Sequence, residues 1–363
     1  MLVLLLFLTA FNCIGEIGDI SDLNKFISES NLICVGSPVK LYIENRKDKE
    51  GKSWSITEIS IDHLIKGEIP SKTINIGTEK IDVETLPEDI RKNLEQNAEE
   101  ALSAVKDARW LLFLMQVDGR DDLYLLTDKY NSIVTVSSSK PSGLDEKLAI
   151  AEHIEKELLG MLESTNKAEY TSACILLHDW GRKSDEIMTA LRKASESKDI
   201  QLKGNAIGVR IVLGDKTAIT DAIEYQPSEG KPSLIGDSIS KINNFEMIPD
   251  LGKCFSSRNI SVRKGAAEAL RRMANEDTEE LIKPIMIKCL DDPDRSVQYH
   301  AIMTLGTLAY KHYEQEGDIV SDEAEAICEA MPGLELFNKE PDEYVNEWKK
   351  MLSRQNSKSE KKD

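Results

Sequence analysis

The sequence predicts a protein of two unlike parts, a β-rich N-terminal domain followed by an α-solenoid built from helix pairs. Two observations favour this fold class. A 35-residue repeat with helical spacing occupies Met247–Leu308, and alternating apolar and polar residues mark short strands before residue 136. Because 40% of the 363 residues are hydrophobic, the chain can bury a sizeable core, and its length favours two or more domains.

The repeat consists of two copies of one apolar pattern, in which each residue of the second copy lies 35 positions after its equivalent. The pattern comprises Leu251, Cys254, Phe255, Val262, Ala266 and Leu270 in the first copy and Met286, Cys289, Leu290, Val297, Ala301 and Leu305 in the second. Side chains four positions apart share one face of a helix. Polar turns at 256–259 and 291–294 separate two helices in each copy, and such pairs must stack to bury their apolar faces.

The runs SVRKGAAEAL and DDPDRSVQYHAIMTLG, at 261–270 and 291–306, resemble HEAT repeats of the phycobilisome-lyase type. Weaker copies of the same pattern stand at 199–206, 213–219 and 340–345, the last after an insertion at 314–322. The resemblance implies about five or six helix pairs between Leu148 and Leu352, each of roughly 30–45 residues.

The first residues, Met1–Phe11, form an apolar run that is too short to span a bilayer and is typical of a secretory signal peptide. Cleavage after Gly15 would give an extracytoplasmic protein, either periplasmic, envelope-associated or secreted. A buried N-terminal helix or strand and a lipid anchor at Cys13 are the alternatives. No integral membrane span is expected.

The segment 19–136 has the composition of a β-rich domain. Leu32–Val35 and Lys40–Ile43 are expected to pair as strands around Gly36-Ser37-Pro38, and a polar turn then leads to an alternating strand at Trp54–Ile61. Later strands are expected at 73–76, 109–115 and 123–126, the last two joined by a turn at Asp118-Gly119. The charged stretch Ile81–Ala108 is interpreted as a helical insertion of unknown role.

The runs VGSPV, SITEISIDHLIKG and RWLLFLMQVDGR resemble secreted domains of the netrin-like, OB-type barrel class. That resemblance implies a small β-barrel-like domain with paired cysteines. Cys34 has no second cysteine within this domain once the leader is removed. By composition, 137–147 is a linker and 353–363 is a disordered tail, so the helical domain is expected at 148–352.

The formal net charge of −18 argues against nucleic acid, whose phosphates require Lys and Arg patches, and against an anionic membrane surface. The acidic surface of the protein itself favours basic partners or divalent cations. Six basic positions nevertheless stand in the repeat region: Lys203, Arg210, Arg263, Lys264, Arg271 and Arg272. In HEAT-like stacks the residue after the repeated valine often forms an Asp–Arg ladder, and Arg263 occupies that position, whereas Gln298 and Lys203 depart from it.

These basic residues have two interpretations. They form ion pairs between repeats, or they form a basic stripe along the concave face that binds an acidic peptide. We expect Arg263, Gln298, Lys203 and Arg271 to bind the partner, with Arg263 and Gln298 the ones that reach solvent.

No catalytic, cofactor or metal site is expected. The six cysteines lack zinc spacing, and Cys254 and Cys289, at equivalent positions, are packing residues or a disulfide pair. The five histidines are expected not to cluster, with His300 at a groove wall or a helix–helix contact. His178-Asp179 is read as a helix end rather than a catalytic base and its orienter. Asp291, Asp292 and Asp294 are read as turn and cap residues rather than calcium ligands.

The sequence therefore predicts a non-catalytic protein–protein interaction or scaffold protein that binds another protein or peptide through the groove lined by the second helices of its repeats. Two alternatives remain. One is a secreted inhibitor or matrix-binding protein that acts through the netrin-like domain, which would require a mature N-terminus at Cys13 bonded to another cysteine. The other is a lyase or cofactor-handling enzyme, by analogy with the repeat family.

Overall fold

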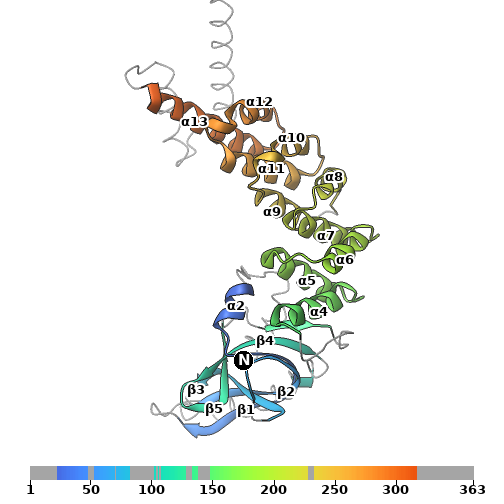
Figure 1. Cartoon of the computed structure of the whole chain (residues 1–363), viewed down its shortest axis with the longest axis vertical. Helices are drawn as coiled ribbons and strands as arrows, with labels where there is room; N and C mark the ends of the chain where they lie inside the picture. The colour runs from blue at the N-terminus through green and yellow to red at the C-terminus, as the bar shows by residue number, and fades with distance from the viewer. Residues whose placement is uncertain are drawn as a thin grey trace, which may run out of the picture. The chain divides into compact units, whose positions relative to one another are not determined.

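The computed structural model describes residues 23–47, 53–69, 71–81, 102–103, 105, 108–127, 133–137, 148–227 and 233–316. The expected signal peptide, most of the expected insertion and linker, the repeat copy at 340–345 and the tail lie outside the described residues. The chain divides into two compact units, Met1–Ala194 and Ser195–Asp363. A six-stranded mixed sheet is followed in the described residues by ten α-helices, so the protein is of mixed α and β class (Figure 1).

The sheet of the first unit contains β1 (Leu32–Lys47), β2 (Ser53–Lys66), β3 (Thr73–Ile81), β4 (Arg109–Val117), β5 (Arg120–Leu126) and β6 (Ile133–Val136). Its strand order is β1-β2-β3-β5-β4-β6, and β1 also pairs with β4 from Leu32 to Gly36. The pairings therefore run from β1 through β2, β3, β5 and β4 and return to β1. All pairs are antiparallel except β3 with β5, where Asn75 lies opposite Leu123.

One strand expectation was wrong, because Leu32–Lys47 is a single strand rather than a pair around Gly36-Ser37-Pro38. Gly36 serves close approach rather than a turn, since a Cβ atom there would lie 2.5 Å from the Ser60 carbonyl oxygen on β2. The turn at Asp118-Gly119 is confirmed, with φ of 73° at Gly119 between β4 and β5.

Both faces of β4 are covered, which explains its unbroken apolar run. One face joins a core of Leu32, Cys34, Ile59, Ile74, Ile76, Trp110, Leu112, Leu114 and Tyr124. On the other face Phe113 packs against Phe26 of α2 (Leu23–Glu29), with ring centroids 5.8 Å apart.

Helices α4 (Ile150–Leu162) and α5 (Lys167–Trp180) pack together beside the sheet. α4 contacts β2 and β6, and α5 contacts β6 and α2. These two helices therefore belong to the compact unit of the sheet, and α6 (Asp185–Ser195) follows them at its end.

The second unit contains α7 (Ile200–Val212), α8 (Thr217–Glu224), α9 (Ile235–Ser240), α10 (Ile248–Cys254), α11 (Ile260–Met273), α12 (Glu279–Cys289) and α13 (Arg295–Glu316). α7 packs on α9, α9 on α11 and α11 on α13, and these four helices are called the odd-numbered row. α8 packs on α10 and α10 on α12, which form the even-numbered row (Figure 1). Contacts between α7 and α8, α10 and α11, and α12 and α13 join the rows.

The core of the second unit lies between the rows. Val262 and Val297 are both fully buried in it, and the equivalent residues Ala266, Leu270, Ala301 and Leu305 belong to the same core. The residues that the 35-residue pattern singles out therefore have matching burial. Where α9 and α11 cross, a Cβ atom on Gly265 would clash with the Gly236 carbonyl oxygen, so glycine is required for this close approach.

Candidate interaction surface

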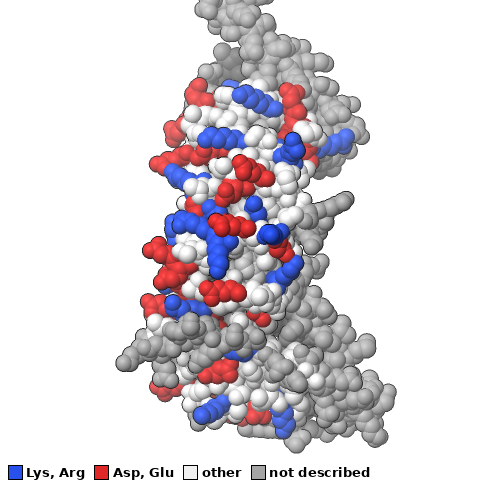
Figure 2. All heavy atoms as spheres, turned by 90° about the vertical axis from the view of Figure 1, so that its right-hand side faces the viewer, with Lys and Arg blue, Asp and Glu red and all other residues white. Residues whose placement is uncertain are grey.

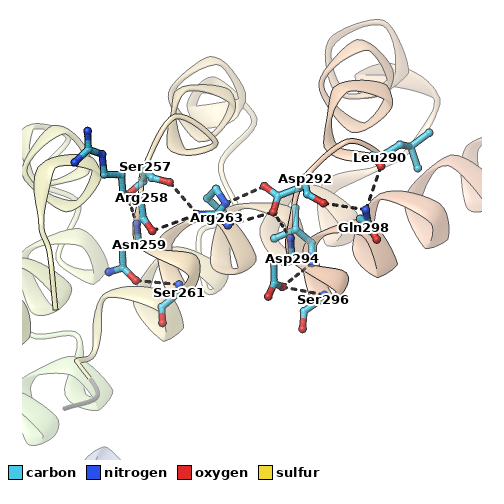
Figure 3. A network of polar contacts seen from close by, with 11 residues as sticks. Ser257, Arg258, Asn259, Ser261, Arg263, Leu290, Asp292, Asp294, Ser296 and Gln298 are labelled. Carbon is cyan, nitrogen blue, oxygen red and sulfur yellow. Dashed lines mark hydrogen bonds and ion pairs between the residues drawn. The ribbon is translucent and has the colours of Figure 1, made fainter. Parts of the chain in front are cut away.

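Three helices of the odd-numbered row begin with the same kind of side-chain cap. Asp199 Oδ1 accepts a hydrogen bond from the Gln201 amide (3.0 Å) at α7, Asn259 Oδ1 from Ser261 (3.0 Å) at α11, and Asp294 Oδ1 from Ser296 (2.9 Å) at α13. The last two are seen in Figure 3. Each cap satisfies an amide that the helix leaves without a partner, which fixes where the helix begins.

A buried ion pair joins α11 to the turn after α12. Arg263 donates from Nε to Asp292 Oδ2 (2.8 Å) and from Nη2 to Asp292 Oδ1 (3.2 Å), and from Nη1 to the Ser257 carbonyl (3.0 Å). Asp292 Oδ1 also accepts from the Asp294 amide (2.8 Å). Figure 3 shows Arg263 between the two turns that precede α11 and α13. The guanidinium group thus fixes the spacing of successive helix pairs.

The side chain of Gln298 forms its hydrogen bonds within the turn that precedes its own helix, α13. Its Nε2 atom donates to the carbonyl oxygens of Asp292 (2.9 Å) and Leu290 (3.3 Å), which matches the bond of Arg263 to Ser257 (Figure 3). The structure therefore brings Arg263 and Gln298 together around Asp292. Arg263 is only 9% exposed, so the expectation that it reaches solvent was wrong, because its guanidinium group is held within these turns.

The other two expected partner-binding residues lie elsewhere. Lys203 is partly exposed on α7, two helices along the odd-numbered row from α11, and Arg271 is partly exposed in the last turn of α11. Arg210 is buried on α7, where it donates to Asp215 (3.1 Å), Asp221 (2.7 Å) and Thr217 (3.0 Å). Burial raises the pKa of the Asp215 carboxyl, but hydrogen bonds from Thr217 and Arg210, together with the charge of Arg210, lower it on balance.

A basic cluster surrounds His300 where α11 meets α13. We define this cluster as Lys264, Arg271, Arg272 and His300. Lys264 and Arg272 are exposed, and Arg272 pairs weakly with Glu268 (3.8 Å). His300 is 8% exposed, and its buried Nδ1 atom has no hydrogen-bond partner. Burial is the largest cause that lowers the pKa of His300, followed by the charge of Arg271, whereas Glu268 acts in the opposite direction.

A second polar network lies within the first unit, between the sheet and α4. Arg109 of β4 donates to Glu157 Oε1 of α4 (3.0 Å), to Asp62 Oδ2 of β2 (2.9 Å) and to the Ser137 carbonyl (2.7 Å). The side chain of Glu157 is fully buried, and its Oε1 lies 3.5 Å from His63 Nε2. This network joins β4, β2, the residue that follows β6 and α4 through a single guanidinium group.

The expectation that the histidines do not cluster was wrong for one pair. The rings of His63 and His153 have centroids 6.0 Å apart, because α4 packs against β2. Sequence reasoning missed this pair because 90 residues separate its members. His178 is buried near the end of α5 and shares a 2.8 Å hydrogen bond with Asp179.

Four cysteines lie among the described residues, and all four are buried free thiols: Cys34, Cys174, Cys254 and Cys289. The disulfide considered between Cys254 and Cys289 is therefore not formed in the structure. Burial, the largest cause in each case, raises the pKa of each thiol to about 12. Packing residues are thus the interpretation that the structure favours for Cys254 and Cys289.

In the described part of the chain, no three His, Cys, Asp or Glu side chains are grouped so that they could hold a metal ion. Over the same residues, none of the helices has the length and apolar character needed to cross a bilayer. Comparison with protein-family models and with curated proteins gives no match.

Proposed function

We propose that the protein is a non-catalytic interaction or scaffold protein that binds another protein or peptide through the odd-numbered row of a HEAT-like α-solenoid. The order of the helix contacts supports this proposal, because each row continues from one helix pair to the next. Such stacking produces an extended surface on which successive helices present side chains in register.

One observation carries the proposal most directly: the ion pair of Arg263 with Asp292, together with the caps at Asn259 and Asp294, fixes α11 and α13 relative to each other. A surface that is rigid before binding loses little conformational entropy when its partner arrives. Side chains at the solvent side of these helices, such as Lys264 and Arg272, are then available for contacts.

The experiment compares the two rows in the full-length chain. A photo-reactive amino acid replaces Lys264 of α11, and in the control it replaces Lys253 of α10, which is also exposed and lies in the even-numbered row. After irradiation in an extract of the source cells, we expect a discrete cross-linked species only from position 264. Equal cross-linking from both positions, or none from position 264, would contradict the proposal.

For the first unit we propose a small barrel-like domain of the OB type, supported by the pairing of β1 with both β2 and β4. We further propose that the protein is exported, as the apolar run Met1–Phe11 suggests. Intact mass and N-terminal sequencing of the native protein should give a mature chain that starts at Glu16. A chain that retains Met1 would refute export, and a lipid-modified start at Cys13 would replace cleavage by anchoring.

A further inference from the structure

Charge is distributed unequally between the two rows of the second unit. The odd-numbered row, with α13 taken to Leu308, carries seven basic residues against two acidic ones. The basic residues are Lys203, Arg210, Arg263, Lys264, Arg271, Arg272 and Arg295, and the acidic ones are Asp237 and Glu268.

The even-numbered row, with the short turns 245–247 and 276–278 that precede α10 and α12, has the opposite balance of eight acidic to three basic residues. The acidic ones are Asp221, Glu224, Glu246, Asp250, Glu276, Asp277, Glu279 and Glu280, and the basic ones are Lys253, Lys283 and Lys288. A chain with a net charge of −18 therefore places a net positive row beside an acidic one.

The positive charge that reaches solvent is concentrated in the basic cluster. Arg210 and Arg263 are buried and already paired with aspartates, so they add little to the surface. In the cluster, Lys264 and Arg271 form no ion pair among the described residues, and Glu268 is the acidic residue whose charge acts on His300 together with theirs. On the face that Figure 2 presents, Lys and Arg side chains lie among Asp and Glu side chains.

His300 adds an independent indication of a ligand. Its Nδ1 atom is buried and lacks a hydrogen-bond partner, a state that costs free energy unless binding supplies the missing group. A carboxylate placed among Lys264, Arg271 and Arg272 would accept hydrogen bonds from these cations. The negative charge of such an anion would also favour a proton on His300, and a carboxylate oxygen that reaches Nδ1 would accept the hydrogen bond that this atom lacks.

We propose that the odd-numbered row binds an acidic segment of a partner polypeptide, whose carboxylates contact Lys264, Arg271 and Arg272 beside His300. This inference rests on the proposed interaction function and specifies the chemical class of the partner. A peptide fits better than nucleic acid, because the neighbouring even-numbered row is acidic and would repel a longer polyanion.

The test uses the full-length chain and fluorescence anisotropy with three labelled probes. These probes are a peptide of about ten residues rich in Asp and Glu, the same peptide with Asn and Gln in their place, and a short single-stranded DNA. We expect the acidic peptide alone to bind, and its affinity to fall about tenfold between about 20 mM and about 150 mM salt, since exposed charges are screened over that range.

Matched charge-reversal variants of the two rows test whether the peptide binds to the odd-numbered row. Lys264→Glu with Arg271→Glu and Arg272→Glu should weaken peptide binding by about tenfold or more, since each lost contact contributes modestly. The control, Lys253→Glu with Lys283→Glu and Lys288→Glu, makes the same charge change on the even-numbered row and should alter affinity by less than about twofold. Because Arg271 is partly buried, the double variant Lys264→Glu with Arg272→Glu is measured as well, and circular dichroism checks that each variant folds.

Equal binding of the amide peptide, tighter binding of DNA, equal losses in both charge-reversal sets, or no binding at low salt would each overturn the proposal. Failure of this proposal can be distinguished from failure of the proposed interaction function. Cross-linking from position 264 to a partner that does not compete with the acidic peptide would retain the interaction role and reject only the acidic class.

Discussion

At the scale of single residues, Arg263 shows why arginine rather than lysine follows the repeated valine. Its two bonds to Asp292 and its bond to the Ser257 carbonyl use three different donors of one planar group. Lysine would keep the charge but has a single nitrogen on a flexible chain. The position therefore contributes to the spacing of helix pairs more than to the surface.

Arg263→Lys is expected to lower the free energy of unfolding of the second unit by about 1–3 kcal/mol, because the buried bidentate contact is lost. Arg272→Lys is the control, since its contact with Glu268 is exposed and 3.8 Å long, and it should change stability by less than about 0.5 kcal/mol. Urea denaturation followed by circular dichroism measures both. Equal effects of the two substitutions would show that the Arg263 geometry is unimportant.

The buried histidine His300 makes stability depend on pH. Its pKa in the folded protein lies below the ordinary value of 6.5, so the unfolded chain takes up the proton first as pH falls through 6.5. The contribution of neutral His300 to the free energy of unfolding is therefore fully present above pH 6.5 and is lost as the pH falls below it. We expect His300→Gln to lose less stability than the wild type between about pH 7.5 and about pH 5.5. Thermal unfolding of both proteins gives the comparison, and parallel pH curves would contradict it.

At the scale of elements, a buried ion pair joins α4 to the sheet. Arg109 and Glu157 come from a strand and a helix that are distant in sequence, and the side chain of Glu157 is fully buried. A buried charge that loses its partner is strongly destabilising, whereas replacing both members with apolar groups is often tolerated.

Glu157→Leu alone is expected to destabilise the first unit by about 3 kcal/mol or more, because it removes the fully buried carboxylate that pairs with the guanidinium group of Arg109. The double variant Arg109→Met with Glu157→Leu should recover part of this loss. Chemical denaturation of both single variants and the double variant completes the cycle. If the effects simply add, the two side chains are not coupled and the network does not hold α4.

Local elements were easier to predict than the contacts between them. The turn at Asp118-Gly119 and the buried strand Arg109–Met115 follow from turn chemistry and an apolar run, and both are present. The sequence predicts two strands within Leu32–Lys47, because glycine and proline usually mark turns. In the structure Gly36 instead gives room for the backbone of β2. The His63–His153 contact required the packing of α4 on β2, which no local pattern contains.

At the scale of the whole molecule, periodicity identified residues that share a core in the second unit, since Val262 and Val297 are equivalent in sequence and equally buried. The ion pair of Arg263 with Asp292 agrees with the Asp–Arg ladder that the resemblance to HEAT-like stacks implied, which periodicity alone does not predict. The basic cluster was only partly predictable. Arg271 and Lys264 stood out in an acidic chain, but the unsatisfied Nδ1 atom of His300 depends on how α13 packs beside α11.

The division into compact units differs from the division that composition suggests. Composition changes from strand-like to helical near residue 148, whereas the first unit continues to Ala194. The reason is that α4 and α5 pack beside the sheet, so helical composition begins well before the unit ends.

That placement of α4 has a practical consequence for anyone who expresses the helical part alone. A fragment that begins at Leu148 would carry Ile154, Glu157 and Leu158, all fully buried in the intact chain, without the strands that shelter them. A fragment that begins at Ser195 leaves those side chains behind. We expect the shorter fragment to remain monomeric in size-exclusion chromatography and the longer one to self-associate, although it contains more of the protein.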